Sequence, residues 1–209
     1  SGEDRRASPG SIRLFEHDIA RASPRRRRRD GLHFVPEERL GRGAVPTLSL
    51  AQNTLLTRTR AVGPGGWLRI GDIEALAASL IKRFNVKAGG PGSAAKSLSG
   101  GNLQKFIVGR EIGQRPKVLI AAQPTWGVDV GASAQIRQAL IDLRERGVAV
   151  LVISEELDEL IEICDRLAVI AQGRLSPPKP VRETSAEEIG LLMAAASPRA
   201  AEAPVAEAQ

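Results

Sequence analysis

The sequence is poor in aromatic residues and nearly free of cysteine. Its 209 residues include no tyrosine, 4 phenylalanines, 2 tryptophans and a single cysteine, Cys164. One cysteine excludes an internal disulfide framework and fits a reducing compartment. A core must therefore be built mainly from Ala, Leu, Ile and Val. Cys164 shares an apolar helical face with Leu157, Leu160 and Ile161, which predicts a buried structural thiol.

The sequence also lacks membrane-spanning and secretory patterns. No apolar run approaches the roughly 20 residues that a membrane-spanning helix needs, and no signal-peptide pattern opens the chain. The histidines, His17 and His33, have no metal-ligand spacing with each other or with Cys164, so we expect no metal site. With 42% hydrophobic and 26% charged residues, the composition is typical of a soluble globular protein with one substantial domain.

Positive charge is in excess, with a formal net charge of +6, and much of it lies in Arg25–Arg29. Such a run is compatible with a basic module that binds nucleic acid through its phosphates. The alternative is the solvated face of a short helix after Ser23 and Pro24, because proline is favoured in the first helical turn. We favour the helix and expect no nucleic-acid partner, because no aromatic residues interleave the arginines to stack on bases.

The most informative segment is 98–105, with the sequence Leu-Ser-Gly-Gly-Asn-Leu-Gln-Lys. It places a serine and two glycines at the start of a helical pattern. Backbone N–H groups at a helix N-terminus point outward unpaired and, with the helix dipole, form a site for an anion. The segment resembles the signature motif of ATP-binding-cassette (ABC) ATPases. In that family the motif touches the γ-phosphate of an ATP held mainly by the other nucleotide-binding domain of a pair.

Apolar segments downstream of this motif alternate between strands and helices. Strands are predicted over 118–122, 149–153 and 167–171, and helices over 132–146 and 157–164. Strands that are apolar on both faces predict a parallel sheet that is covered on both sides.

Upstream of the motif the pattern is less regular. It predicts short strands over 10–15 and 32–35, and two helices that Ser49 and Asp72 cap and that end near Thr57 and Phe84. A last helix, through about Ala195, is expected to begin with a capping box formed by Ser185 and Glu188.

The resemblance implies an α/β fold, with a P-loop NTPase-like parallel sheet core flanked by helices and an inserted α-helical subdomain that carries the signature motif. It divides the chain into an N-terminal part of the core with strands and Q-loop (1–47), the helical subdomain (48–115) and a C-terminal α/β core (116–195). Residues 196–209, rich in Ala, Glu and Pro, are expected to form a disordered tail.

Two further segments are similar to the second nucleotide-binding domain of tandem ABC ATPases that energise uptake of simple sugars and nucleosides. Residues 34–43 resemble that subfamily's Q-loop, with Glu37 at the glutamine position. Residues 122–132 resemble its Walker B and D-loop segment, with Asp129 in the D-loop.

Several positions depart from the common cassette pattern. Walker B usually ends in Asp-Glu, but here Ala122 cannot interact with a cation, and Gln123 can orient water without accepting its proton. Glu155 occupies the place of the switch histidine. The P-loop pattern is absent, because Gly90–Ser97 carries Ala95 at the final glycine position and no strand precedes it. The chain is therefore interpreted as a fragment that starts just past a P-loop helix.

The resemblance implies the ATPase domain of an importer for simple sugars or nucleosides, at the cytoplasmic face of the bacterial inner membrane. Its partners would be another nucleotide-binding domain, a membrane permease and, indirectly, a substrate-binding lipoprotein. ATP and Mg²⁺ would be held mainly by the partner domain, so the chain alone is not expected to hydrolyse ATP. A non-functional fragment is a further alternative. Gln123 and Glu155 would be degenerate catalytic positions, and the nucleotide-contacting residues would be Ser99, Gly100, Gly101, Asn102, Gln104, Asp129 and Glu37.

Overall fold

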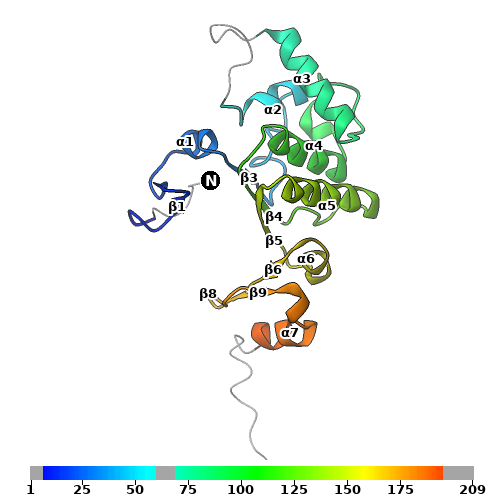
Figure 1. The fold of residues 1–209 in the computed structure, drawn as a ribbon. Helices are drawn as coiled ribbons and strands as arrows, with labels where there is room; N and C mark the ends of the chain where they lie inside the picture. Colours follow the sequence, from blue (N-terminus) through cyan, green and yellow to red (C-terminus); the bar gives the residue numbers. More distant parts are fainter. Residues whose placement is uncertain (1–6, 60–68, 195–209) are drawn as a thin grey trace, which may run out of the picture. The chain divides into compact units, whose positions relative to one another are not determined.

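The computed structural model describes residues 7–59 and 69–194, and the expected tail over 196–209 lies outside them. The chain forms two compact units, Ser1–Ser154 and Glu155–Gln209 (Figure 1). The predicted α/β class with a parallel sheet is confirmed in the first unit. Among the described residues, no helix is both long and apolar enough to cross a membrane.

A three-stranded parallel sheet forms the centre of the first unit. Its strands are β3 (Leu32–Val35), β4 (Val118–Ala122) and β5 (Ala149–Ile153), in the order β3-β4-β5, and the predicted bounds of all three are confirmed. Phe34 lies beside Ile120, which in turn lies beside Leu151. Parallel pairing brings the carboxyl ends of β4 and β5 to one edge of the sheet.

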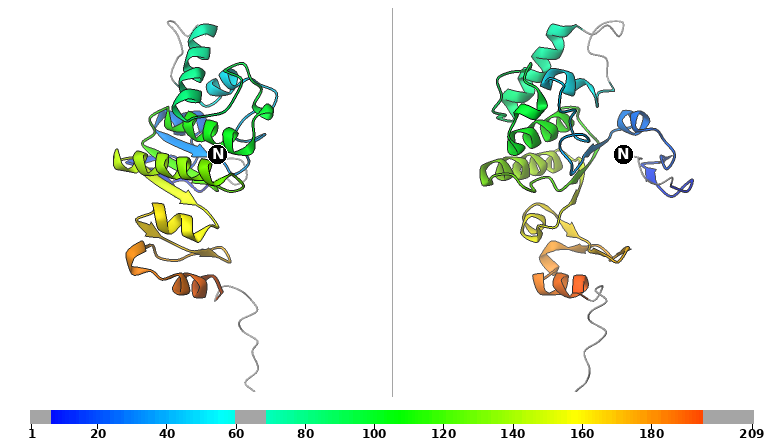
Figure 2. Two further views of the ribbon diagram at one scale, coloured as in Figure 1. Left: turned by 90° about the vertical axis from the view of Figure 1, so that its right-hand side faces the viewer. Right: turned by 180° about the vertical axis from the view of Figure 1, so that it is seen from behind.

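The two faces of this sheet differ in burial. On one face Val35, Leu119 and Ala121 have no exposed surface, and helices α4 (Gly100–Ile112) and α5 (Val130–Glu145) pack there (Figure 2). On the other face Leu151 is 53% exposed and Ile153 is 49% exposed. The prediction of a sheet covered on both sides is therefore wrong for β5 within the described residues. An apolar run does not show whether both faces of its strand are covered.

The helical part of the first unit contains α2 (Leu50–Leu55) and α3 (Ile70–Arg83), which pack on each other next to α4 in Figure 1. The predicted cap of α2 is confirmed: the Ser49 side chain accepts from the Gln52 backbone, and the Gln52 side chain accepts from the Ser49 backbone. The predicted cap of α3 is wrong, because the helix begins after Arg69. Asp72 lies in its first turn, where a negative charge favours the helix dipole.

The segment 90–97, which partly matches a P-loop, is a connection between helices. It contains a short 3₁₀ helix, η2 (Ala95–Ser97), and leads directly into α4. The N–H groups of Ala95 and Lys96 donate to the carbonyls of Leu48 and Pro46, each at 3.0 Å. Its backbone is thus tied to the residues that precede α2, as expected of a linker between helices.

The N-terminal residues form a hairpin and a short helix. Strands β1 (Arg13–Leu14) and β2 (His17–Asp18) pair antiparallel, so the strand predicted over 10–15 is only two residues long. Phe15 ends it with a positive φ of 52°. Helix α1 (Pro24–Arg29) begins after Ser23, whose side chain accepts from the Arg26 backbone, as the Ser-Pro pattern predicts.

The second unit begins with α6 (Leu157–Ile163) and continues in two antiparallel strand pairs. Strand β6 (Arg166–Leu167) pairs with β9 (Lys179–Pro180), and β7 (Ile170–Ala171) pairs with β8 (Arg174–Leu175). The single parallel strand predicted over 167–171 is therefore wrong. Gln172 and Gly173 both have positive φ, as a two-residue hairpin turn requires.

The end of the second unit holds η3 (Val181–Glu183) and α7 (Ala186–Ala194). The Ser185 side chain accepts from the Glu188 backbone at 3.1 Å, which confirms half of the predicted capping box. The Glu188 carboxylate forms an ion pair with Lys179. Cys164 is only half-buried, so its predicted full burial is wrong.

Candidate functional site

The first turn of α4 is open to solvent. Ser99 precedes the helix with extended backbone, and its side chain does not cap the helix. Its hydroxyl accepts from the Asn102 side chain at 2.9 Å, and the Asn102 side-chain oxygen accepts from the Lys87 backbone at 2.8 Å. Ser99 and Gly100 are exposed. The first turn of α4 thus begins at exposed residues, and its backbone has no side-chain cap beside the Ser99 hydroxyl, an arrangement that suits an anion.

Gly101 is buried against the loop that follows β4. A Cβ built on Gly101 would lie 2.9 Å from Asp129 Oδ2 and 3.3 Å from the Cβ of Ala132. Asp129 in turn caps α5, because its Oδ1 accepts from the Ala132 backbone at 2.9 Å. Glycine at position 101 thus allows the first turn of α4 to lie against the first turn of α5. The structure places the predicted residues Ser99, Gly101 and Asp129 together.

Gln104 joins the same two segments from inside. It has no exposed surface, and its Nε2 donates to the Pro124 carbonyl at 2.9 Å. Lys105 is 8% exposed and donates to the Asn85 carbonyl at 2.6 Å. Burial lowers the Lys105 pKa, although the Asp129 charge partly opposes this. The place of Gln104 in the motif predicts a direct contact with a nucleotide. None of its atoms is exposed, so the structure gives no support to that contact.

Arg39 connects the segment after β3 with the segment after β4, a contact that no pattern in the sequence predicts. Its guanidinium donates to the Trp126 carbonyl and, at 3.5 Å, to the Gly127 carbonyl. Burial lowers its pKa, but the group stays charged. The Trp126 side chain is 58% exposed next to this contact. The Trp126 side chain is therefore not packed inside its own loop.

Gln123 follows β4 in a strained conformation. Its φ is 47°, a left-handed value that residues other than glycine rarely adopt, and its N–H donates to the Ile153 carbonyl at 2.7 Å. Ala122 and Gln123 are half-buried at the carboxyl ends of β4 and β5. In open α/β sheets, ligands bind at this edge.

The remaining predicted residues are exposed. Glu37 lies two residues beyond the end of β3, and Glu155 is the first residue of the second unit, two residues after β5. Among the described residues, no group of three or more His, Cys, Asp or Glu side chains could hold a metal ion. Ala122 has no side-chain oxygen and Gln123 has no carboxylate, so the Walker B position lacks the carboxylate through which proteins usually bind Mg²⁺.

The arginine run of α1 is largely committed to contacts within the chain. Arg26 pairs with Asp30, Arg27 donates to the carbonyls of Ile19 and Ala20, and the Arg28 Nη1 lies 2.6 Å from Glu111 Oε2. Three of the five arginines thus stabilise the N-terminal segment. This arrangement supports the helix interpretation over a nucleic-acid patch.

Glu111 at the end of α4 is the centre of a buried ionic cluster. It is fully buried, accepts from Arg28 and Arg110, and lies 3.0 Å from the His33 Nδ1. Burial would raise the Glu111 pKa, but the hydrogen bond from His33 and the charges of Arg110 and Arg28 outweigh it and lower the pKa to about 2. Because an ionised carboxylate only accepts, the His33 Nδ1 carries the proton.

The sequence is similar to import ATP-binding proteins. It is 38% identical over 199 residues to the guanosine import ATP-binding protein NupO of Bacillus subtilis (94% of this chain, 39% of that protein). It is 40% identical over 186 residues to the nucleoside import ATP-binding protein NupA of Lactococcus lactis (88% and 37%). It is 36% identical to the ribose import ATP-binding protein RbsA of Shouchella clausii (86% and 36%). The chain thus spans under two fifths of these relatives. No family model matches it.

Solved structures decide the fold. The dimeric post-hydrolysis state of the ATP-binding cassette MJ0796 bound to ADP and Pi matches with a TM-score of 0.66 at 19% identity, over 82% of this chain and 73% of that chain. The fold is that of an ATP-binding cassette. A nucleotide-free ATP-binding cassette from an ABC transporter also matches, over 90% of this chain and 73% of that chain, with a TM-score of 0.62 at 21% identity. The homologues of this chain include ATP-binding proteins of sugar and nucleoside importers.

Proposed function

We propose that this cassette is a nucleotide-binding component of an ABC importer for simple sugars or nucleosides. It would correspond to the degenerate second nucleotide-binding domain. In this proposal it lends the first turn of α4 and the Asp129 loop to an ATP held on the P-loop of a partner domain. The names of its relatives support the transport class, since they include guanosine, nucleoside and ribose import proteins. The proposal does not choose between a simple sugar and a nucleoside as the solute.

The observation that carries the proposal is the open first turn of α4. Ser99 leaves this turn uncapped, while Gly101 packs it against Asp129. A packed backbone holds the donors in place before an anion arrives, which is the condition for strong electrostatic stabilisation. The exposed side chains of Trp126 and Val130, at 58% and 83%, flank the same loop and support a protein partner there.

The residues at this chain's own Walker B position support the proposal that the partner domain holds the nucleotide. Ala122 cannot hold Mg²⁺, and Gln123 can orient water but cannot accept its proton. ATP would supply the phosphate that the α4 amides contact, and its metal would be held by the partner. Gln104 then acts as a positioning residue that fixes α4 against Pro124.

The proposed partners follow from the exposed residues and from the relatives. A P-loop domain would contact Ser99 and Trp126, and exposed Glu37 would face a permease helix. The permease places the cassette at the cytoplasmic face of the bacterial inner membrane, where a substrate-binding lipoprotein would act through the permease. The arginine run gives no support to a nucleic-acid partner, because three of its members bond within the chain.

The test pairs the full chain with an intact P-loop domain from a homologous importer and measures steady-state ATP turnover. Ser99→Ala removes one donor that strengthens toward the transition state, so we expect a loss of about 10²–10³ in rate. The KM for ATP should stay within a few fold, because the partner makes most ground-state contacts.

The matched control is Ser97→Ala, an exposed serine two residues upstream whose hydroxyl donates to the Ala94 carbonyl. It should leave turnover within about twofold of the parent. Equal losses in Ser97→Ala and Ser99→Ala would contradict the assigned contact.

A further inference from the structure

A cationic cavity lies at the amino ends of β3 and β4. Gly31 and Lys117, which immediately precede these strands, both line it. Its volume is about 360 Å³, within the range of about 300–1,000 Å³ that small-molecule sites occupy. Four arginines and one lysine line it, and no carboxylate is among the described residues that do: Arg28, Arg29, Arg58, Arg115 and Lys117.

Local structure holds the cations of this cavity in place. Gly31 accepts from the backbones of Lys117 and Val118 at 2.9 and 3.1 Å, which fixes Lys117 beside α1. The Lys117 ammonium lies 5.3 Å from the centre of the Phe15 ring, a cation–π distance. A side chain at Gly31, whose φ is +104°, would lie 2.9 Å from Lys117 Cγ. Glycine there allows the lysine to lie against the backbone.

Glu111 is a buried carboxylate beside this cavity, and Arg28 is its partner among the lining cations. It neutralises Arg28 and is shared with Arg110 and His33. Within the described part of the chain, the side chains of Arg29 and Arg115 form no ion pair. An anion that enters the cavity would therefore meet several cations with no competing carboxylate in the lining.

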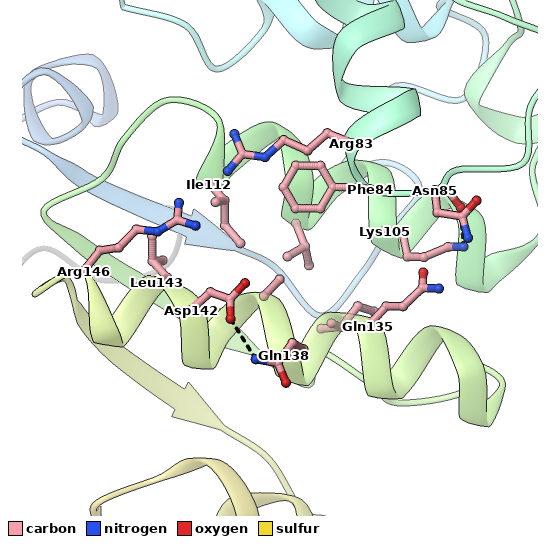
Figure 3. Close-up of a pocket in the computed structure, with 13 residues that line it drawn as sticks. Arg83, Phe84, Asn85, Lys105, Ile112, Gln135, Gln138, Asp142, Leu143 and Arg146 are labelled. Atoms are coloured by element: carbon pink, nitrogen blue, oxygen red, sulfur yellow. Dashed lines mark hydrogen bonds between the residues drawn. The ribbon is translucent and has the colours of Figure 1, made fainter.

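A second cavity among the described residues has a volume of about 390 Å³ (Figure 3). It lies between α3, α4 and α5 and also has three cations in its lining. Asp142 is in the same lining and accepts from Gln138 at 2.7 Å, while the Lys105 ammonium is bonded to the Asn85 carbonyl. Charge there is mixed, so of these two cavities the one at the amino ends of β3 and β4 is better suited to an anion.

We propose that this cationic cavity binds a small phosphate-bearing anion with at least two negative charges. Guanidinium groups match the oxygens of a phosphate with paired N–H donors, and charge-assisted hydrogen bonds of this kind are about twice as strong as neutral ones. The cavity is at the opposite end of the strands from Gln123, so this binding is independent of the ATP contact proposed for α4.

The test is calorimetric titration of the full chain with inorganic pyrophosphate at low ionic strength. Arg115→Asn and Lys117→Gln each remove one cation, and asparagine tolerates the positive φ of 56° at position 115. We expect each variant to weaken binding by about tenfold or more. Arg83→Gln and Arg146→Gln remove the same charge from the other cavity and should change binding by less than about twofold. Circular dichroism checks that all four variants fold.

Three outcomes decide the proposal. Absence of saturable binding, or equal weakening by Arg83→Gln and Arg115→Asn, would overturn it. A Ser99→Ala chain should bind pyrophosphate as the parent does, and a loss there would instead assign the anion to α4.

Vesicles distinguish the source of the phosphate. Sedimentation with phosphatidic acid vesicles but not phosphatidylcholine vesicles, lost in Lys117→Gln, would assign the anion to a lipid headgroup. Pyrophosphate titration without vesicle binding would assign it to a free phosphate compound. Either result supports the cavity as the anion site.

Discussion

The two ends of α4 differ in almost every physical respect. Its first turn begins with exposed Ser99 and Gly100, and no side chain caps it. Its last turn ends in Arg110 and Glu111, which are 2% and 0% exposed and bonded to each other and to neighbouring elements. One end is open to an anion, and the other is closed around its own charges.

Contacts at both ends fix the position of α4 in the first unit. The ion cluster at Glu111 joins α4 to α1 and β3 through Arg28 and His33. Gly101 and Gln104 then direct the opposite end against the Asp129 loop. A helix held at its far end presents its first-turn N–H groups at little entropic cost when the anion binds.

The largest expected effect on stability comes from a substitution in the buried ionic cluster around Glu111, at the C-terminal end of α4. Glu111→Gln keeps the shape but leaves Arg28 and Arg110 without a counter-charge in a buried site. Removing one partner of a buried ion pair costs about 3–5 kcal/mol, so we expect a loss of that order in the free energy of unfolding. Urea denaturation measures it. Glu145→Gln, at an exposed helix end, is the control and should change stability by less than about 0.5 kcal/mol.

Low pH should lower the free energy of unfolding through the same residue, Glu111. The Glu111 pKa is about 2 in the folded chain against an ordinary value of 4.5, so its ionised form stabilises the fold above pH 4.5. That contribution, on the order of 3 kcal/mol, is lost as the pH falls from about 5 toward 2. Unfolding free energy measured across this range should fall less steeply in Glu111→Gln than in the parent. Identical slopes would show that other carboxylates carry the acid response.

Smaller effects are expected at the open end, where the two glycines have different neighbours. Gly101→Asp places a carboxylate against Asp129, and we expect a loss of about 1–3 kcal/mol in unfolding free energy. A Cβ on Gly100 meets the end of the Arg39 side chain at 2.8 Å and the Gly127 carbonyl at an ordinary 3.8 Å, so Gly100→Asp should cost less than about 1 kcal/mol. Thermal unfolding of the two variants side by side checks this order. Equal destabilisation would show that the Asp129 contact does not explain the glycine at 101.

Much of the fold could be predicted because its strongest signals are local. The bounds of β3, β4 and β5 and the Ser49 cap follow from apolar runs and turn residues, and the structure agrees with them. The split of 167–171 between two strands could not be predicted, because β6 pairs with β9, more than ten residues further along the chain, and no local pattern shows that pairing. The exposure of Leu151 also depends on tertiary neighbours that no local pattern reveals.

The candidate site could be predicted as a set of residues but not as a geometry. The motif indicated Ser99 and Gly101, and the structure places Gly101 against Asp129. Burial of Gln104 and the contact of Arg39 with Trp126 depend on segments about 20 and 87 residues away in the sequence. Such contacts have no local pattern, so they became visible only in the folded chain.

The central claim is that this cassette contributes Ser99 to a nucleotide held elsewhere, while its own Gln123 end does little chemistry. The most direct measurement compares Ser99→Ala with Gln123→Leu in the chain paired with an intact P-loop domain. We expect Ser99→Ala to lower ATP turnover by about 10²–10³ and Gln123→Leu to stay within a few fold of the parent. A silent Ser99→Ala together with loss of turnover in Gln123→Leu would contradict the account, because the nucleotide would then react at this chain's own Walker B end.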